Sequence, residues 1–283
     1  MSALNVQDIQ RRVRSISSTK KLTNAMMLIA TSNLRKYRLK MQESRIFYDT
    51  YLDLGNDIFS RYLEDHDHPY LYRKHDDMKK LFIVIFSSVS MSSSFNYAIA
   101  NFLKTKIKEG DELYVIGNRK MANVALQRQS IPNKIVFSQS ELSIGSRLEA
   151  ILERILRLYK NETYGSIELI YMHYKNPLVF IPKAKYLLPY FKDKEDIITN
   201  NTNLLIEPNI EAIVNALIPH VLSASIYGKY IESRVSEQAS KRNQMENATN
   251  NAQEIIDNLL MERARVRQGN ITEEINEITS ALL

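Results

Sequence analysis

The residue types that most often do chemistry occur in this chain, but their spacing indicates no active site. The segments Asp65-His-Asp-His-Pro69 and His75-Asp-Asp77 carry the side chains that bind divalent metals. They lie in a polar stretch with no apolar frame to fix ligands, so we expect solvated loop residues there. His173 and His220 are far apart in sequence and have no nucleophile pattern around them. We therefore expect no catalytic, cofactor-binding or metal-binding residues.

A second candidate for chemistry is the serine-rich run Ser87–Ser94, which follows the apolar run Leu81–Phe86. In α/β proteins the loop after the first strand often binds a ligand. This loop contains no glycine, so it matches neither the dinucleotide fingerprint nor the phosphate-binding P-loop. Because serine side chains accept hydrogen bonds from the first amides of a helix, we expect a helix cap here.

The composition favours long helices over a fold with many turns. The chain has 283 residues, with only seven glycines and seven prolines. It has no cysteine, which excludes disulfides, thiolate-bound zinc and iron–sulfur clusters. The longest apolar run, Leu81–Phe86, is much shorter than the ~20 residues of a membrane helix. We also find no apolar signal core at the N-terminus, so we expect a soluble protein without direct membrane insertion.

Both ends of the chain predict long helices. Proline is absent from 5–59, and positions spaced alternately by four and three residues from Ile9 to Tyr51 are apolar at ten of thirteen sites. A similar but interrupted pattern runs from Leu217 to Leu282, through Met245, Ala248, Ala252, Ile255 and Leu259. Neither helix can bury its apolar seam alone. We therefore expect the two ends to pair as an antiparallel coiled coil.

Between these helices, short β-rich runs alternate with helical stretches. Strands are expected at 81–86, 113–116, 134–137 and 166–174, with an antiparallel edge strand containing Pro182 at 178–188, and helices at 95–108, 120–129 and 144–160. The alternation predicts a Rossmann-like α/β domain with a mostly parallel sheet. The expected organisation is a coiled-coil helix over 1–60, a loop over 61–78, the inserted α/β domain over 79–205 and a second coiled-coil helix over 206–283.

Basic residues gather near the N-terminus. Residues 11–40 hold nine Lys and Arg and no Asp or Glu, whereas residues 230–283 hold six basic and nine acidic residues. A basic helix can bind nucleic acid, an anionic membrane or an acidic protein surface. The basic stretch is interleaved with aliphatic residues, and Tyr37 is its only aromatic residue. A nucleic-acid-binding coiled coil is therefore the more distant alternative, as is an α/β enzyme with helical extensions.

Several strings at the two ends resemble the γ subunit of F-type ATP synthases. They are Thr19-Lys-Lys-Leu-Thr-Asn-Ala-Met26, Ser225-Ile-Tyr-Gly228, Ser236-Glu-Gln-Ala239, Arg265-Val-Arg-Gln268 and Ile271-Thr-Glu-Glu274. The resemblance covers the whole chain in order. It implies a central rotor shaft, itself non-catalytic and without a cofactor, that turns inside a ring of three α and three β subunits. Such a complex lies at the cytoplasmic face of the cell membrane.

The resemblance also implies which residues meet the ring. Arg267 and Gln268 match positions that contact an acidic catch loop of β, with Thr272 and Glu274 nearby. Met26 and Lys241 match a second contact with β, where the family has arginine in place of Lys241. A shaft that must turn freely also needs a smooth apolar tip, which suits Ile275, Ile278, Leu282 and Leu283.

Departures from the family pattern leave the foot of the shaft open. The family's Asp-Arg-Gly-Leu-x-Gly after the first strand is Ser88-Val-Ser-Met-Ser-Ser93 here, and its lysine before the Ala-Met pair is Asn24. The partner at the foot would be the ε subunit and the membrane c-ring. In a specialised paralogue, such as a gliding-associated motor without ordinary proton coupling, it would be a cytoskeletal protein. Abundant Asn, Ile and Lys indicate an AT-rich genome such as that of a mollicute.

Overall fold

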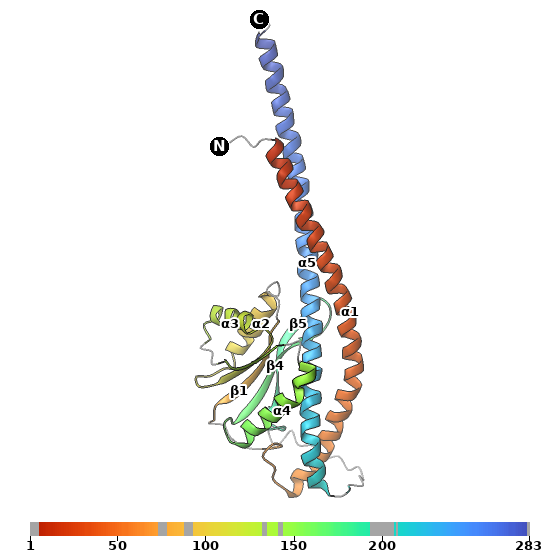
Figure 1. Cartoon of the computed structure of the whole chain (residues 1–283), viewed down its shortest axis with the longest axis vertical. Coiled ribbons are helices and arrows are strands. Elements are labelled where there is room, and N and C mark those ends of the chain that lie inside the picture. Colours follow the sequence, from red (N-terminus) through yellow and green to blue (C-terminus); the bar gives the residue numbers. More distant parts are fainter. Residues whose placement is uncertain are drawn as a thin grey trace. The chain divides into compact units, whose positions relative to one another are not determined.

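The structure is a computed structural model that describes residues 6–72, 78–87, 93–131, 135–140, 144–192, 207 and 209–281. Its elements in chain order are α1 (Val6–Asp65), β1 (Lys80–Ile85), α2 (Ser93–Lys104), β2 (Glu112–Ile116), α3 (Arg119–Arg128), β3 (Ile135–Gln139), α4 (Ile144–Lys160), β4 (Ser166–Tyr174), β5 (Phe180–Leu188) and α5 (Ile210–Ala281) (Figure 1). Contacts divide the chain into two units. The helix-pair unit comprises residues 1–33 and 241–283, and the sheet unit comprises residues 34–240.

Helix α1 buries the stripe that its sequence predicts. All thirteen positions of the four-and-three spacing from Ile9 to Tyr51 are buried or half-buried, although Lys20, Thr23 and Ser44 are polar. The intervening positions are mostly exposed. The heptad pattern of the N-terminal helix is therefore confirmed.

In the helix-pair unit, α1 and α5 run antiparallel. Thr249 Oγ1 donates a hydrogen bond to Thr23 Oγ1 at 2.8 Å, and Lys20 Nζ donates to Gln253 Oε1. Residue numbers increase from Lys20 to Thr23 along α1 while those of their partners decrease from Gln253 to Thr249 along α5, so the two helices are antiparallel. The buried apolar side chains of this unit are Ile9, Ala30, Met245, Ala252, Ile256 and Leu259.

Four residues of the predicted α5 stripe are exposed rather than buried: Ile255, Ile271, Ile275 and Ile278. Ile255 is 45% exposed, and its neighbour Ile256, at 8%, is buried in its place. After Met245 the fully buried positions are Ala252, Ile256 and Leu259, and the half-buried Thr249 completes an alternation of four-residue and three-residue steps. The hydrogen bond between Thr249 and Thr23 lies in the seam, and the predicted Ala248 beside it is half-buried.

In the sheet unit, the five strands form one sheet in the order β3-β2-β1-β4-β5. The first four are parallel, and β5 pairs antiparallel with β4, with Pro182 opposite Met172. Proline is tolerated in β5 because an edge strand needs backbone donors on one side only. The predicted mostly parallel sheet with an antiparallel edge strand is confirmed, and β4 and α4 have the bounds that the sequence predicts.

Each face of the sheet has its own apolar core. Alternate residues of β1 point to opposite faces: Phe82 and Val84 pack with α2 and α3, whereas Leu81 and Ile83 pack with α4 and with parts of α1 and α5 (Figure 1). Strands buried on both faces read as continuous apolar runs, which is why β1 stood out in the sequence.

Helices α1 and α5 also pack closely within the sheet unit. Leu34 of α1 packs with Val235 and Ala239 of α5 in a small buried cluster. Glycine permits the closest approaches: a Cβ atom on Gly228 would lie 3.0 Å from Cδ2 of Tyr48, and one on Gly55 would lie 2.9 Å from Val221 Cγ2. The predicted antiparallel pairing of the two terminal helices is therefore seen in each unit.

Helix α5 begins with a sequence-encoded cap and a strongly apolar segment. Asn209 Oδ1 accepts a hydrogen bond from Ala212 N at 2.8 Å, and the helix continues through Pro219. Among the described residues, α5 alone has the length and composition to cross a membrane; its apolar window has a mean hydropathy of 1.4 and is 44% buried within the protein. Leu217, Ile218 and Val221 pack against the sheet, as is typical of a core helix.

Candidate contact surface on the long helices

The most exposed part of the helix-pair unit is the end of α5. Every side chain from Arg267 to Ser280 is exposed, in contrast to the stripe that ends near Leu259. Within this unit α5 continues past the point where α1 begins (Figure 1). We call residues 267–281 the α5 terminal segment. A single helix of this length is marginal in water without packing, so the segment suits a binding surface for another protein.

Four of the predicted contact residues lie on this segment. Arg267 and Glu274 are seven residues apart and therefore share one face of the helix. Ile271 lies between them on this face, and Ile278 follows Glu274 by one turn. Thr272 Oγ1 donates to the carbonyl of Gln268 at 2.9 Å. The shared face combines a guanidinium, a carboxylate and two aliphatic side chains. A guanidinium can form two parallel hydrogen bonds with a partner carboxylate.

The predicted apolar tip is described only in part. Ile275 is 57% exposed and Ile278 is 62% exposed. Leu282 and Leu283 lie outside the described residues. The exposed isoleucines match the requirement for an apolar surface that binds loosely, and the tip remains a prediction.

The other two predicted contact residues lie elsewhere. Met26 on α1 and Lys241 on α5 are both half-buried. Lys241 precedes Arg267 by 26 residues, which corresponds to about 39 Å along a helix. The predicted contact residues thus lie in two separate regions of the helices rather than in one.

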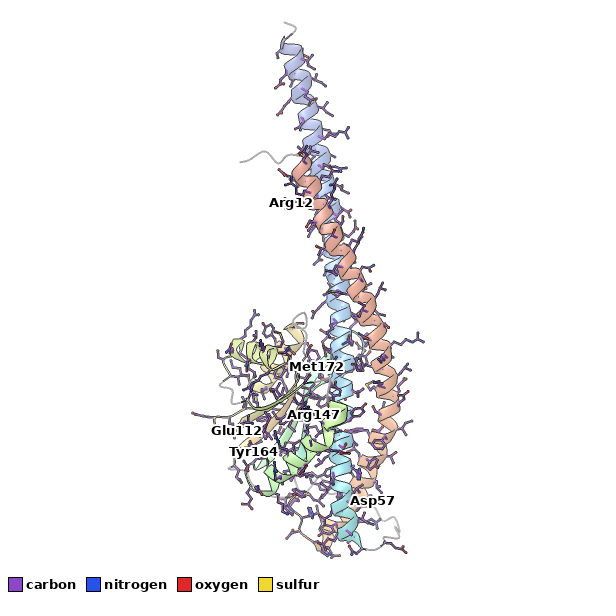
Figure 2. All side chains as sticks on the ribbon, in the orientation of Figure 1. Arg12, Asp57, Glu112, Arg147, Tyr164 and Met172 are labelled. Carbon is purple, nitrogen blue, oxygen red and sulfur yellow. The ribbon has the colours of Figure 1, made fainter. Side chains whose placement is uncertain are left out.

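Basic side chains of α1 are exposed in the helix-pair unit. They are Arg11, Arg12, Arg14 and Lys21 (Figure 2 labels Arg12). Arg11 forms an ion pair with Asp8 at 3.5 Å, but both side chains are largely solvated. Exposed pairs of this kind contribute little to stability. This positive surface can therefore face an acidic partner without disrupting the helix pair.

Some strings that carry the family resemblance are internal. Ser236 and Glu237 are buried at the end of the sheet, where Glu237 Oε1 accepts a hydrogen bond from Ser87 Oγ at 2.7 Å. Ser87 N in turn donates to Asn96 Oδ1 at 2.8 Å. Ser87 therefore fastens the end of β1 to α5 and α2, and residues 88–92 of the serine-rich loop lie outside the described part. These residues position the sheet on α5.

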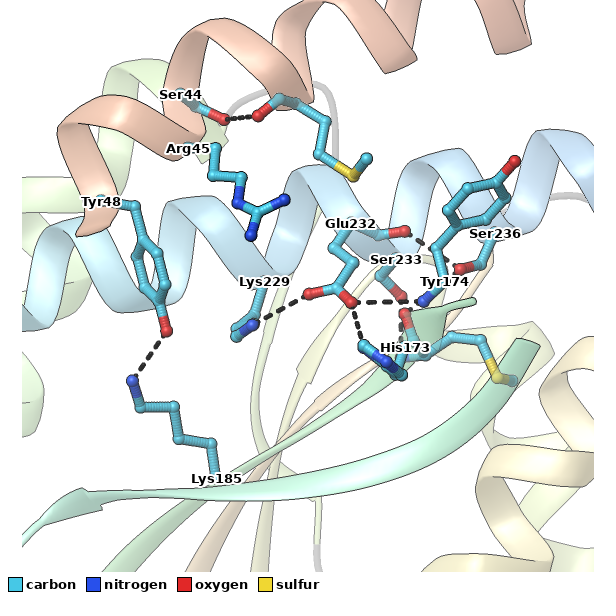
Figure 3. Close-up of polar contacts among 12 residues, drawn as sticks. Ser44, Arg45, Tyr48, His173, Tyr174, Lys185, Lys229, Glu232, Ser233 and Ser236 are labelled. Carbon is cyan, nitrogen blue, oxygen red and sulfur yellow. Dashed lines mark hydrogen bonds and ion pairs between the residues drawn. The ribbon is translucent and has the colours of Figure 1, made fainter. Parts of the chain in front are cut away.

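Glu232 is the centre of a second internal polar cluster (Figure 3). Its carboxylate accepts hydrogen bonds from Lys229 Nζ at 3.0 Å, from Tyr174 N at 3.2 Å and from His173 Nδ1. Burial opposes the charge on Lys229, but Glu232 and Tyr48 together raise the pKa of this lysine above its ordinary value. A cavity of about 270 Å³ adjoins the cluster. The sequence analysis found His173 but not its partner, because the two are 59 residues apart.

The prediction of a solvated loop is wrong for His68. This side chain is only 9% exposed; it lies between Tyr62 and Tyr70, and its Nε2 is 3.4 Å from Asn215 Oδ1. Burial lowers its pKa. The rings of Tyr62 and Tyr70 form the apolar surroundings that the sequence analysis did not expect around His68. His75 lies outside the described residues, among which no group of three or more His, Cys, Asp or Glu side chains could hold a metal ion.

Replacing Glu232 with glutamine is expected to lower the free energy of unfolding by about 2–3 kcal/mol. The variant keeps the shape of the side chain but leaves Lys229 and His173 without their carboxylate. Glu246→Gln is the matched control, because Glu246 pairs with Arg242 at 3.6 Å on the surface. It should cost less than about 0.5 kcal/mol. Urea unfolding of the two variants measures the difference, and equal losses would contradict a stabilising role for the cluster.

The fold and its exposed helix define a class of protein. Two terminal helices pair antiparallel, a mostly parallel sheet lies between them in the sequence, and the side chains at the end of α5 are exposed. Together these features define a class of protein in which an α/β domain is inserted between two long paired helices.

Comparisons with known proteins identify the family. A family model described as ATP synthase matches residues 5–282. The ATP synthase gamma chain of Malacoplasma penetrans is 33% identical, with 99% of this chain and 98% of that relative aligned. The gamma chain of Mycoplasma mobile is 32% identical, with 97% of each chain aligned. The chain belongs to the ATP synthase gamma chain family.

Solved structures show the same fold. A chain from the central stalk and c-ring structure of the Tetrahymena thermophila mitochondrial ATP synthase has a TM-score of 0.59 and 22% identity. It aligns over 80% of this chain and 99% of its own length. A rotor chain of the Euglena gracilis mitochondrial ATP synthase has a TM-score of 0.53 and covers 88% of this chain.

Proposed function

We propose that this chain is the central rotor shaft of an F-type ATPase, coupling ATP hydrolysis or synthesis in a head of α and β subunits to rotation. The observation that carries the proposal is the α5 terminal segment, where a guanidinium, a carboxylate and isoleucines are exposed together and suit a partner surface. The relatives named ATP synthase gamma chain, and the central-stalk and rotor structures with the same fold, support it.

In this proposal the shaft drives or follows the head by differential binding. Arg267, Gln268, Thr272 and Glu274 form one set of contacts with β, and Met26 with Lys241 forms another. A shaft angle that gives stronger contacts with one β conformation favours that conformation, so nucleotide exchange and shaft angle become linked free energies. Ile275 and Ile278, together with Leu282 and Leu283, provide the apolar bearing. Apolar contacts have no preferred direction, which allows the tip to turn.

The shaft itself is non-catalytic in this account. ATP binds and reacts in the head, and this chain contributes positions, charge and stiffness. It acts in the cytoplasm as a peripheral part of a complex at the inner face of the cell membrane. At its foot it meets the ε subunit and the c-ring. A cytoskeletal partner there would instead indicate a specialised paralogue.

Co-purification tests this proposal directly. A tagged full-length chain is expected to recover α and β subunits in a complex that hydrolyses ATP. Recovery of a membrane ring in the same complex indicates an ordinary synthase, and recovery of cytoskeletal proteins without the ring indicates the paralogue. Recovery of neither α nor β would contradict the proposal, as would salt-sensitive binding to DNA or RNA as the sole interaction.

A further inference from the structure

Lys185 differs from the other half-buried lysines of the sheet unit in having no carboxylate partner. Lys80 pairs with Glu168 at 3.1 Å, and Lys229 pairs with Glu232 at 3.0 Å. No carboxylate of the described residues lies within 4.0 Å of the Lys185 amine. Instead its Nζ donates to the hydroxyl of Tyr48 at 2.8 Å (Figure 3). A buried cation normally requires an opposite charge, so its absence here needs an explanation.

The surroundings of Lys185 disfavour its charge. The Lys185 amine lies 5.0 Å from the centre of the Tyr48 ring, and the Lys229 amine lies 5.1 Å from the same ring. Burial, followed by the positive charge of Lys229, lowers the pKa of Lys185 to about 8. Glu232 compensates Lys229 rather than Lys185. The hydroxyl of Tyr48 is neutral and only partly replaces water.

Lys185 also lines a cavity of about 390 Å³. Its polar lining includes Lys192 and Asn56, and its walls are the rings of Tyr186, Tyr190 and Phe191. No carboxylate of the described residues lines the cavity. Asn56 Oδ1 accepts a hydrogen bond from the Tyr190 hydroxyl at 2.7 Å, so its amide NH₂ remains as a donor. The Lys185 side chain and the Asn56 amide therefore line an opening large enough for a small molecule.

We propose that this cavity binds a small oxyanion, of the phosphate or carboxylate class, through Lys185 and Asn56. The anion supplies to Lys185 the opposite charge that Glu168 supplies to Lys80 and Glu232 supplies to Lys229. An oxyanion suits the site better than a halide because several oxygens can accept from several donors at once. This site is distinct from the α5 terminal segment and does not depend on the proposed rotary function.

Chemical labelling of the full-length chain tests the proposal. An amine-reactive reagent is applied across pH 6–10 (about 2 units either side of the expected midpoint), and mass spectrometry gives the rate at each lysine. In chloride, Lys185 should become reactive near pH 8, while the exposed Lys183 of the same strand should need a higher pH. Inorganic phosphate at the same ionic strength should slow Lys185 several-fold and move its midpoint upwards, because a bound anion stabilises the ammonium.

The arms of the experiment separate the possible anions. Phosphate and acetate are tested in parallel, and Lys183 reports any general effect of the salt. Slowing by phosphate alone defines a phosphate site, and slowing by acetate alone defines a carboxylate site. Equal labelling of Lys185 in phosphate, acetate and chloride would overturn the proposal.

A variant gives an independent test. Phosphate should raise the Tm of the unmodified chain by binding the folded state. Lys185→Met removes the amine but keeps an unbranched side chain, and the rise in Tm should be lost in this variant. Lys183→Met should retain it. A phosphate-dependent rise that is unchanged in Lys185→Met would place the anion elsewhere and refute the proposal.

Discussion

Replacing Met245 with proline is expected to uncouple ATP hydrolysis from rotation in the assembled complex. Met245 is 8% exposed in the seam between α1 and α5, and Ala252, one repeat further along, is 6% exposed. Proline removes a backbone hydrogen bond and clashes with the preceding turn, at a cost of roughly 3 kcal/mol. A shaft that bends or unwinds at this point cannot transmit torque along its length. Hydrolysis by the head should continue while ATP-driven proton pumping or rotation falls to background.

Two further variants complete this test. Ala252→Pro should have the same effect, because it breaks the same helix in the same seam. Met245→Leu preserves the helix and the apolar volume, so it should remain coupled. Full coupling in both proline variants would show that the paired helices need not be rigid for function, which contradicts the account.

The Arg267→Ala substitution is expected to lower ATP hydrolysis by the assembled complex about tenfold, because a charge-assisted hydrogen bond contributes about 1.5–3 kcal/mol. Arg267 is exposed, so the free energy of unfolding of the isolated chain should hardly change. The defect would therefore arise from the contact with β rather than from misfolding. Steady-state hydrolysis and urea unfolding measure the two effects separately.

Arg265 provides the matched control for Arg267. It is also exposed, but a spacing of two residues places it on the opposite side of the helix. Arg265→Ala should leave most of the activity, and Arg267→Lys should recover part of it. Equal losses in Arg265→Ala and Arg267→Ala would mean that net charge, rather than a directed contact, explains the effect.

The helices and strands were predictable because apolar spacing reports burial directly. The four-and-three spacing of α1 was correct at every position, including the polar Lys20 and Thr23. The error at Ile255 has a local cause: Ile255 and Ile256 are adjacent, and either fits a seven-residue repeat. The hydrogen bond between Thr249 and Thr23 accompanies the register that buries Ile256, and no single helix sequence reveals such a partner. Ile271, Ile275 and Ile278 keep the apolar spacing but are exposed, because the described part of α1 begins at Val6 and offers no partner for that end of the helix.

Polar contacts inside the sheet unit were not predictable from spacing. Glu232 lies 59 residues from His173, and Tyr48 lies 137 residues from Lys185. Such pairs depend on how the helices pack against the sheet, so no local sequence pattern predicts them. His68 was misjudged for the same reason, because the rings that bury it became neighbours only in the folded chain.

The surface of α5 was predictable through the family resemblance rather than through periodicity. Arg267 and Gln268 lie on an exposed helix, as a contact with a partner requires. In contrast, Ser236 and Glu237 belong to a string that also resembles the family, but they are buried at the end of the sheet. A shared string can therefore reflect the internal attachment of a domain as well as a surface for a partner.

Single-molecule rotation tests the central claim most directly. The chain has no cysteine, so Leu178→Cys, at a position 77% exposed in the turn before β5, gives a unique site for a probe. With the α and β head fixed to a surface, ATP should drive the probe in one direction, pausing three times per turn as a head with three β subunits requires. A probe that stays still, or only fluctuates in both directions, while the same complexes hydrolyse ATP would contradict the account.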